Sequence, residues 1–296
     1  MFLRWLTTFL FSFFLISSLL VSQALAQEGG LRDEQPPIPV SQIIQNFAAK
    51  EAQFRLARAN YVYRQDLKVQ ELDSRNRVLG EYHVISNILF ESPGRRTEKI
   101  VYAPQSTLKG IQITPQDLED IRSIQPFVLT TDDLHLYNVK YLGKEQIDEI
   151  DNYVFEVSPR VIEEGERYFE GKIWVDDIDL QIVKTFGKAV PDIVKDGQEN
   201  LFPRFETYRE QIDGVFWFPT YTRAVDTLNF STGSKRIRQV IKYEEYKQFG
   251  SDVQLTFGDE VDEEDPETDK ESESEDQEKS KGPGGKKKKP KGPGSG

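Results

Sequence analysis

Residues 167–187, RYFEGKIWVDDIDLQIVKTFG, show how most of this chain is built. The stretch predicts two strands, near 167–176 and 179–187, joined by a tight connection at 176–179. Aromatic residues in alternating runs favour β structure, and Asp favours turns because its carboxylate accepts hydrogen bonds from nearby backbone amides. We therefore expect two neighbouring antiparallel strands here.

Strand and turn continue to alternate on both sides of this pair. Asp213-Gly214 and Ser231-Thr232-Gly233 are hairpin signals. Near the N-terminal side, apolar residues fall on one parity from Tyr61 to Val69 and polar residues on the other, which is typical of a strand with one buried face. The further expected strands lie near 61–70, 79–91, 95–102, 134–142, 152–158, 203–213, 216–228 and 235–249.

Two segments show a helical pattern instead. Apolar residues recur at helical spacing from Ser41, the expected N-cap, to about Ala59. The stretch Thr114-Pro115-Gln116-Asp117 is a strong helix start, because Thr can cap, Pro fits the first helical position and Asp suits the positive end. This second helix should end near Ile124.

About ten antiparallel strands with two helical segments are inconsistent with a parallel α/β fold. They predict a mainly β protein of the α+β type, with a strongly curved antiparallel sheet or half-barrel.

Two motifs carry a family resemblance. One is Tyr168–Asp176 with the following Leu180–Lys184, and the other is Phe205–Arg209 leading to Asp213–Thr220. A Gly-x-Ile-Trp-Val-Asp strand and a later Asp-Gly-x-x-Trp-x-Pro hairpin resemble the lipoprotein-sorting-protein-like group of the LolA/LolB-like superfamily. The resemblance covers about residues 41–257.

The resemblance implies a half-barrel whose concave side is covered by helices, with an apolar cavity for acyl chains between them. Residues 41–59 and 106–125 would then form the lid. Arg64 is a candidate for the arginine that latches the lid in carriers of that superfamily. The chain departs from the minimal carriers in its greater length and its charged tail.

The two ends of the chain differ in composition from its body. Residues 1–26 combine Arg4, an apolar run and small residues at Ala24 and Ala26, which predicts a cleavable signal peptide and a periplasmic protein; an uncleaved inner-membrane anchor is the alternative. Residues 27–40 are a polar linker. An acidic and then basic tail at 258–296 is expected to be disordered, either as a solvating tail or as a charge-based docking arm.

Composition limits the class of protein further. The 296-residue chain has a formal net charge of −12 and no cysteine. The acidic balance argues against nucleic-acid binding, which usually needs a basic face. An exported chain without disulfides depends on its core for stability.

The apolar strand faces are the main candidate binding site. Lipid tails need apolar walls, whereas ordinary core packing against the helices is the alternative reading of the same pattern. The basic strand at 235–242 could likewise face lipid phosphates or be a solvated outer face. The residues expected to line the apolar cavity are Tyr61, Tyr63, Leu67, Tyr82, Val84, Ile88, Phe90, Phe169, Ile173 and Val175.

Catalytic and metal signals are weak. His83 and His135 lie on separate expected strands without ligand-like spacing, so we expect no metal and no cofactor. The sequence pairs no nucleophile with an adjacent base, so we expect no catalytic residues and no enzyme activity.

The expected function is a non-catalytic periplasmic carrier for a lipid or lipoprotein acyl group, with peripheral membrane contact an option. The alternative is an envelope protein-interaction or sensor domain on the same scaffold.

Overall fold

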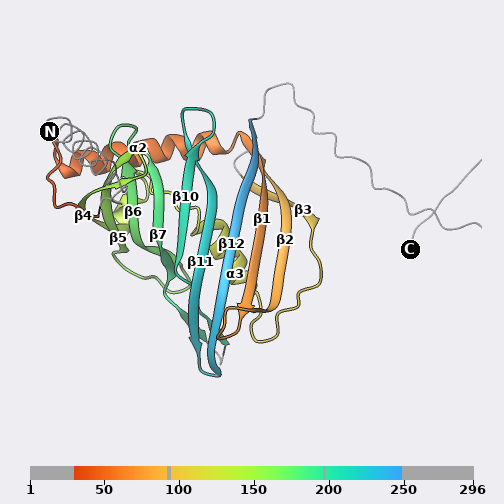
Figure 1. Ribbon diagram of the computed structural model, residues 1–296. Helices are drawn as coiled ribbons and strands as arrows, with labels where there is room; N and C mark the ends of the chain where they lie inside the picture. The colour runs from red at the N-terminus through yellow and green to blue at the C-terminus, as the bar shows by residue number, and fades with distance from the viewer. Residues whose placement is uncertain (1–29, 92–94, 196–197, 249–296) are drawn as a thin grey trace, which may run out of the picture. The chain divides into compact units, whose positions relative to one another are not determined.

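The computed structural model describes residues 30–91, 95–195 and 198–248 (Figure 1). By its internal contacts the chain divides into Met1–Val253 and Gln254–Gly296, and the described residues all belong to the first unit. The expected signal peptide and the expected tail lie outside the described residues.

Ten strands form one open antiparallel sheet, in the order β3-β2-β1-β12-β11-β10-β7-β6-β5-β4. The mainly β fold class expected from the sequence is therefore confirmed. The strands of this sheet are β1 (Tyr61–Leu72), β2 (Val78–Glu91), β3 (Arg95–Tyr102), β4 (Tyr137–Ile147), β5 (Ile150–Pro159), β6 (Tyr168–Asp176), β7 (Ile182–Val190), β10 (Phe205–Gln211), β11 (Trp217–Phe230) and β12 (Gly233–Gln248).

Three elements are small additions to this plan. Strands β8 (Ile193–Lys195) and β9 (Gln198–Asn200) pair with each other as a separate two-stranded hairpin, which the sequence did not predict. The short 3-10 helix η1 (Leu134–Leu136) stands where the strand β4 was expected to begin.

The expected turn at 176–179 is present, where the Asp176 carboxylate accepts hydrogen bonds from the amides of Ile178 at 2.7 Å and Asp179 at 2.9 Å.

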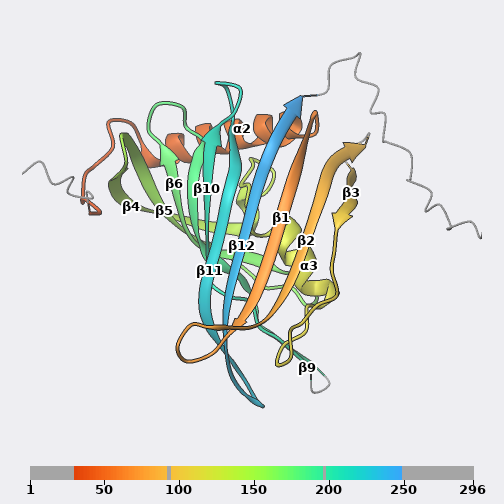
Figure 2. The same cartoon turned by 45° about the vertical axis from the view of Figure 1, so that its right-hand side comes forward.

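Helix α2 (Val40–Arg58) crosses the strands on the same face of the sheet as helix α3 (Pro115–Ser123) (Figures 1 and 2). Its N-cap is Pro39, without a side-chain cap, so the expectation that Ser41 caps the helix is wrong. Pro39 ends the extended lead-in with a carbonyl that accepts the first helical bonds, from Gln42 and Ile43. Among the described residues, no helix is long and apolar enough to cross a membrane.

The inner face of α2 meets one strand after another. Phe47 packs on Phe155 of β5 at a ring distance of 5.4 Å, and Phe54 packs on Phe218 of β11 at 5.3 Å. One turn later, Arg58 lies 5.6 Å from the ring of Phe90 on β2.

These contacts require a curved sheet. β5 and β2 are seven strand spacings apart in the sheet order, or about 34 Å along a flat sheet. The helix advances only about 16 Å between Phe47 and Arg58. Side-chain reach and the curl of the sheet towards the helix account for the difference.

The core fills much of the space between sheet and helices. Phe127, on the segment that follows α3, stacks on Phe169 of β6 with ring centroids 4.3 Å apart. Phe47, Phe155 and Phe169 have no exposed surface. The inner face at β5 and β6 is thus packed by the chain's own aromatic side chains.

The lead-in before α2 protects one edge of the sheet. Arg32 pairs with Lys144 of edge strand β4 through two backbone hydrogen bonds of 2.7 and 2.9 Å. Gly143 allows the close approach, because a Cβ there would lie 2.1 Å from the Arg32 carbonyl oxygen, and its φ of 138° also favours glycine. Covering an edge in this way prevents it from pairing with another chain.

Candidate binding site

Two cavities lie on the helix-covered face, and α3 contributes residues to both. The first, which we call the arginine cavity, has a volume of about 630 Å³ and includes Glu119, Arg122 and Ser123 from the C-terminal half of α3. The second, which we call the insert chamber, has a volume of about 510 Å³ and includes Asp117 and Ile121. Both volumes are within the range of small-molecule sites, about 300–1,000 Å³.

The insert chamber lies between the insert expected at 106–125 and the neighbouring strands. Its walls combine apolar side chains from β1, β11 and β12 with the insert on one side and the segment after β9 on the other. The apolar lining residues are Val69, Ile111, Ile113, Ile121, Leu201, Phe202, Pro203, Leu228, Phe230 and Ile237.

The insert is held at its start by Glu71 of β1. The Glu71 carboxylate accepts hydrogen bonds from the backbone amides of Gly110 at 2.8 Å and Lys109 at 3.3 Å, and pairs with Lys235 at 3.4 Å. Burial raises the pKa of Glu71, but these amides and Lys235 outweigh it and leave the pKa below its ordinary value. A Cβ at Gly110 would lie 2.2 Å from both the Glu71 carboxylate and the Lys235 ammonium group, so these side-chain ends would have to shift for a larger residue.

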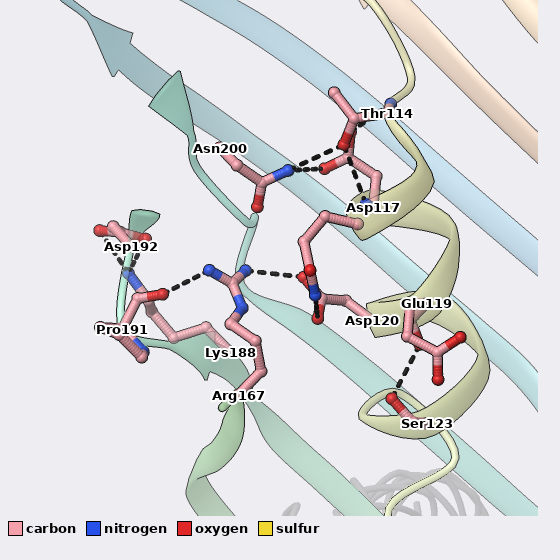
Figure 3. Close-up of polar contacts among 11 residues, drawn as sticks. Thr114, Asp117, Glu119, Asp120, Ser123, Arg167, Lys188, Pro191, Asp192 and Asn200 are labelled. Carbon is pink, nitrogen blue, oxygen red and sulfur yellow. Dashed lines mark hydrogen bonds and ion pairs between the residues drawn. The ribbon is translucent and has the colours of Figure 1, made fainter. Parts of the chain in front are cut away.

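Helix α3 begins where the sequence predicts, with Thr114 as its N-cap, and the structure adds a capping box with Asp117. The Thr114 hydroxyl accepts a hydrogen bond from the Asp117 amide at 3.1 Å, and the Asp117 carboxylate accepts one from the Thr114 amide at 2.7 Å. Asn200 of β9 then donates to the Asp117 carboxylate at 2.8 Å and to the Thr114 hydroxyl at 3.1 Å (Figure 3). The cap therefore also joins the insert to the opposite wall of the chamber.

A buried ion pair anchors the middle of α3. Asp120 and Arg167 lie 2.7 Å apart with side chains that are 1% and 5% exposed (Figure 3). Arg167 also donates to the Pro191 carbonyl, while Gln116 donates to the Asp120 carboxylate at 3.0 Å. Because both ions are desolvated, removing either one would leave the other as an uncompensated buried charge, which is strongly destabilising.

A second buried ion pair anchors α2. Arg209 of β10 donates to both carboxylate oxygens of Glu51 at 3.1 Å, and both side chains are at most 1% exposed. The amide of Ile182 donates to the same carboxylate at 3.1 Å, and Arg209 also donates to the carbonyl of Phe127. This cluster therefore joins α2, the sheet and the segment after α3.

The sequence contains a signal for this cluster, although none of its residues was among the expected site residues. Positions 47, 51, 54 and 58 have the 4-3-4 spacing that places residues on one face of a helix. Phe47 and Phe54 mark that face as buried, which indicates that Glu51 lies in the interior. Its partner Arg209 comes from a distant strand, and no local pattern indicates it.

The residues expected to line the apolar cavity divide into a buried group and a partly buried group. Tyr61, Leu67, Val84, Ile88, Phe169, Ile173 and Val175 are buried, whereas Tyr63, Tyr82 and Phe90 are partly buried. Phe90 lines the arginine cavity, and the walls of the insert chamber come from other residues. A ligand-binding role for the ten remains a prediction.

Tyr61, a member of the buried group, contacts Phe218 and Asp213. Its ring lies 4.6 Å from that of Phe218, and its hydroxyl donates to the Asp213 carboxylate. Burial and then this hydrogen bond raise the pKa of Tyr61 to about 12. These contacts join Tyr61 to the small buried cluster that Phe54 of α2 forms with Phe218.

The charged residues singled out from the sequence contact side chains of their own strand or of a neighbouring strand. Arg64 pairs with Glu245 of the adjacent strand β12 at 3.8 Å, so the latch role predicted for it stays a prediction. On β12, Lys242 pairs with Glu244 at 4.0 Å, and Arg238 donates to Gln70 of the neighbouring strand at 3.4 Å. Arg238 and Lys242 lie on the strand face opposite to the buried Ile237 and Ile241.

The described ranges contain no group of three or more His, Cys, Asp or Glu side chains placed to hold a metal ion. His83 contacts Asp66 of the neighbouring strand at 2.8 Å, and His135 contacts the Asp132 carbonyl at 2.7 Å. The expectations of no metal, no cofactor and no catalysis stay predictions.

No protein-family model matches the sequence, and no curated protein matches it. The fold is similar to that of a DUF1329 family protein from Desulfovibrio piger, with 14% identity and a TM-score of 0.36 over 74% of this chain and 95% of that chain. A LolA superfamily protein from Nitrosomonas europaea matches with 15% identity and a TM-score of 0.33, over 69% of this chain and 94% of that chain.

An outer-membrane lipoprotein-sorting protein domain from Vibrio parahaemolyticus matches with 12% identity and a TM-score of 0.32, over 70% of this chain and 93% of that chain. LolA-like proteins, which the sequence resembles, are thus among the solved structures to which this chain is similar. At such identities and TM-scores, the matches carry no argument about what this chain binds.

Proposed function

We propose that this chain is a non-catalytic periplasmic binding protein that holds the acyl chain of a lipid or lipoprotein in the insert chamber. The observation that carries the proposal is the chamber itself, about 510 Å³ with apolar side chains from β1, β11, β12 and the insert. Transfer of an acyl chain from water to such walls contributes roughly 25 cal/mol per Å² of apolar surface removed from water.

The packing of the neighbouring core supports this choice of chamber. Phe127, Phe155 and Phe169 fill the sheet face at β5 and β6, which leaves no room there for cargo. The insert chamber, by contrast, is lined by the segment that the family resemblance predicts to be part of a lid. In the proposal, α3 moves away to admit the acyl chain and returns to exclude water.

The attachments of α3 are suited to such a movement. Its buried residues are Asp120 and Ile121, so few apolar contacts oppose its release. Polar contacts through Asn200 and Arg167 hold it in place instead. Segments with few buried apolar contacts open at lower free energy than the core does.

Mass spectrometry of lipids that co-purify with the full chain from native membranes tests the proposal. We expect fatty-acyl lipids in about stoichiometric amount, displaced when excess fatty acid is added. A protein that carries no lipid and ignores a fluorescent fatty acid would contradict lipid binding. If such a protein still crosslinks in cells to one envelope protein, the interaction-domain alternative gains support instead.

A further inference from the structure

The arginine cavity is a second, chemically different space on the helix-covered face. It lies between the C-terminal end of α2, helix α3 and the strands β2 and β3, with a volume of about 630 Å³. Four arginines and two glutamates line it together with a few apolar residues. The lining residues are Arg55, Arg58, Phe90, Arg96, Glu98, Glu119, Arg122, Ser123, Pro126 and Val128.

Arg58 is the arginine of this cavity that lacks a carboxylate partner. Within the described ranges its guanidinium makes no hydrogen bond or ion pair, and its Nε is buried without a partner. Its contacts are instead with the faces of two rings, Phe54 at 5.8 Å and Phe90 at 5.6 Å. A cation held between rings and next to a cavity has unused donors for an anion.

One carboxylate orients two of the other arginines. Glu98 of β3 accepts hydrogen bonds from Arg96 at 3.0 Å and from Arg122 of α3 at 3.1 Å, and its other oxygen accepts one from Ser86 at 2.7 Å. These partners outweigh burial and hold the pKa of Glu98 below its ordinary value. A single negative charge thus fixes two guanidinium groups on the cavity wall and neutralises only one of them.

The remaining charges leave the cavity electropositive. Arg55 lies 3.3 Å from Asp132 and 3.4 Å from Asp133, so its charge is largely compensated. Glu119 lies 4.0 Å from Arg122 with a side chain that is 61% exposed, so water screens it. The lining residues alone carry four arginines and two glutamates, and Arg58 is the one of these arginines that no ion pair within the described ranges compensates.

From this geometry we infer that the arginine cavity binds a tetrahedral oxyanion of the phosphate type, either free or as the head of a lipid. Guanidinium groups form two parallel hydrogen bonds to such oxygens. The donors come from three elements, α2, β3 and α3, and surround the space from several sides. This arrangement suits a tetrahedral anion better than a planar carboxylate.

The inference goes beyond the proposed acyl site and does not depend on it. The two cavities have different walls, and a ligand with both a phosphate head and an acyl chain is not required. The apolar wall residues Phe90, Pro126 and Val128 leave room for an organic group attached to the phosphate.

Calorimetric titration of the full chain with inorganic phosphate, and separately with soluble dihexanoylphosphatidylglycerol, tests the inference. Arg58→Gln should weaken binding of the effective probe about tenfold or more, since it removes charge-assisted hydrogen bonds. Arg75→Gln is the matched control, because Arg75 is exposed and lies in the turn after β1. Arg58 precedes the other end of that strand, so the two arginines are far apart along it. Acetate, a planar anion, should bind more weakly than phosphate.

A thermal-shift measurement separates binding from folding. Phosphate should raise the melting temperature of the wild type and of Arg75→Gln, but not of Arg58→Gln. Arg58→Gln also loses the contacts with the rings of Phe54 and Phe90, so binding is measured as the shift that phosphate causes in each variant and not as its melting temperature without phosphate.

The two probes also distinguish the sources of the anion. Binding of inorganic phosphate that depends on Arg58 supports a site for the free anion. Binding of the lipid alone, again dependent on Arg58, supports a head-group site. Absence of binding to both probes, or equal binding by Arg58→Gln and wild type, would overturn the inference, whatever the outcome of the fatty-acid experiments.

Discussion

Helices α2 and α3 cover the same sheet, but they are held in different ways. α2 buries Ile43, Phe47, Ala48, Glu51 and Phe54, whereas α3 buries Asp120 and Ile121. Each helix has one buried ion pair, α2 with Arg209 of β10 and α3 with Arg167, the residue before β6. Helix α2 is therefore part of the core, whereas α3 lies over the sheet and is held mainly by polar contacts.

The largest expected effect is at the α2 anchor. Arg209→Met leaves the Glu51 carboxylate buried without its cation, so the free energy of unfolding should fall by about 3–5 kcal/mol. Urea denaturation measures the loss. Arg223→Met is the matched control, because Arg223 is 54% exposed and its pair with Glu206 should contribute less than about 1 kcal/mol. Equal losses in the two variants would show that α2 is not anchored in this way.

The α3 anchor should respond locally rather than globally. Asp120→Asn keeps the shape of the side chain but removes a charge-assisted hydrogen bond to Arg167, which contributes about 1.5–3 kcal/mol. Hydrogen exchange of the α3 amides should therefore accelerate about tenfold to a hundredfold. Exchange in α2 should stay as in the wild type. If both helices accelerate together, they form one cooperative unit and α3 is not a separate lid.

Acid should loosen the start of the insert through Glu71. Its folded-state pKa is depressed, so its contribution to stability is present above the ordinary carboxyl pKa and is lost as pH falls through the lower folded value. Unfolding curves at decreasing pH, from about pH 5 downwards, should show a smaller loss of stability in Glu71→Gln than in the wild type. Identical pH profiles would mean that the amides of Lys109 and Gly110 do not stabilise the ionised carboxylate.

The smallest effect is expected at the cap of α3. Thr114→Ala removes the acceptor for the Asp117 amide and should cost about 1 kcal/mol, measured as local exchange in the first turn of the helix. Ser123→Ala, in the last turn, removes a bond to the Glu119 carbonyl and should stay within about 0.5 kcal/mol. The ordering of these two variants, more than their size, checks that the cap matters.

The sequence predicted the strands well because their faces repeat every second residue. Strand parity placed Phe169 and Ile173 on the inner face, and both are buried there. Parity does not say whether an inner residue meets a neighbour or a cavity. Here Phe127, from a segment without alternation, stacks on Phe169.

The cavities could be predicted only in part. The helix start at Thr114 correctly predicted α3, which contributes residues to both cavities. The hairpin that carries Asn200 has no alternating pattern, and the arginine cavity combines Arg58, Arg96 and Arg122 from segments far apart in the chain. Such sites depend on tertiary contacts, so a one-dimensional pattern contains little information about them.

Binding of a fluorescent fatty acid by Leu228→Arg tests the central claim most directly. Leu228 lines the insert chamber, and a guanidinium there would place a charge where the acyl chain should lie. Val225→Arg is the control on the same strand, because Val225 is 54% exposed. We expect Leu228→Arg to lose at least about tenfold in affinity, while Val225→Arg binds like the wild type. Wild-type affinity in a folded Leu228→Arg would contradict an acyl site in the insert chamber.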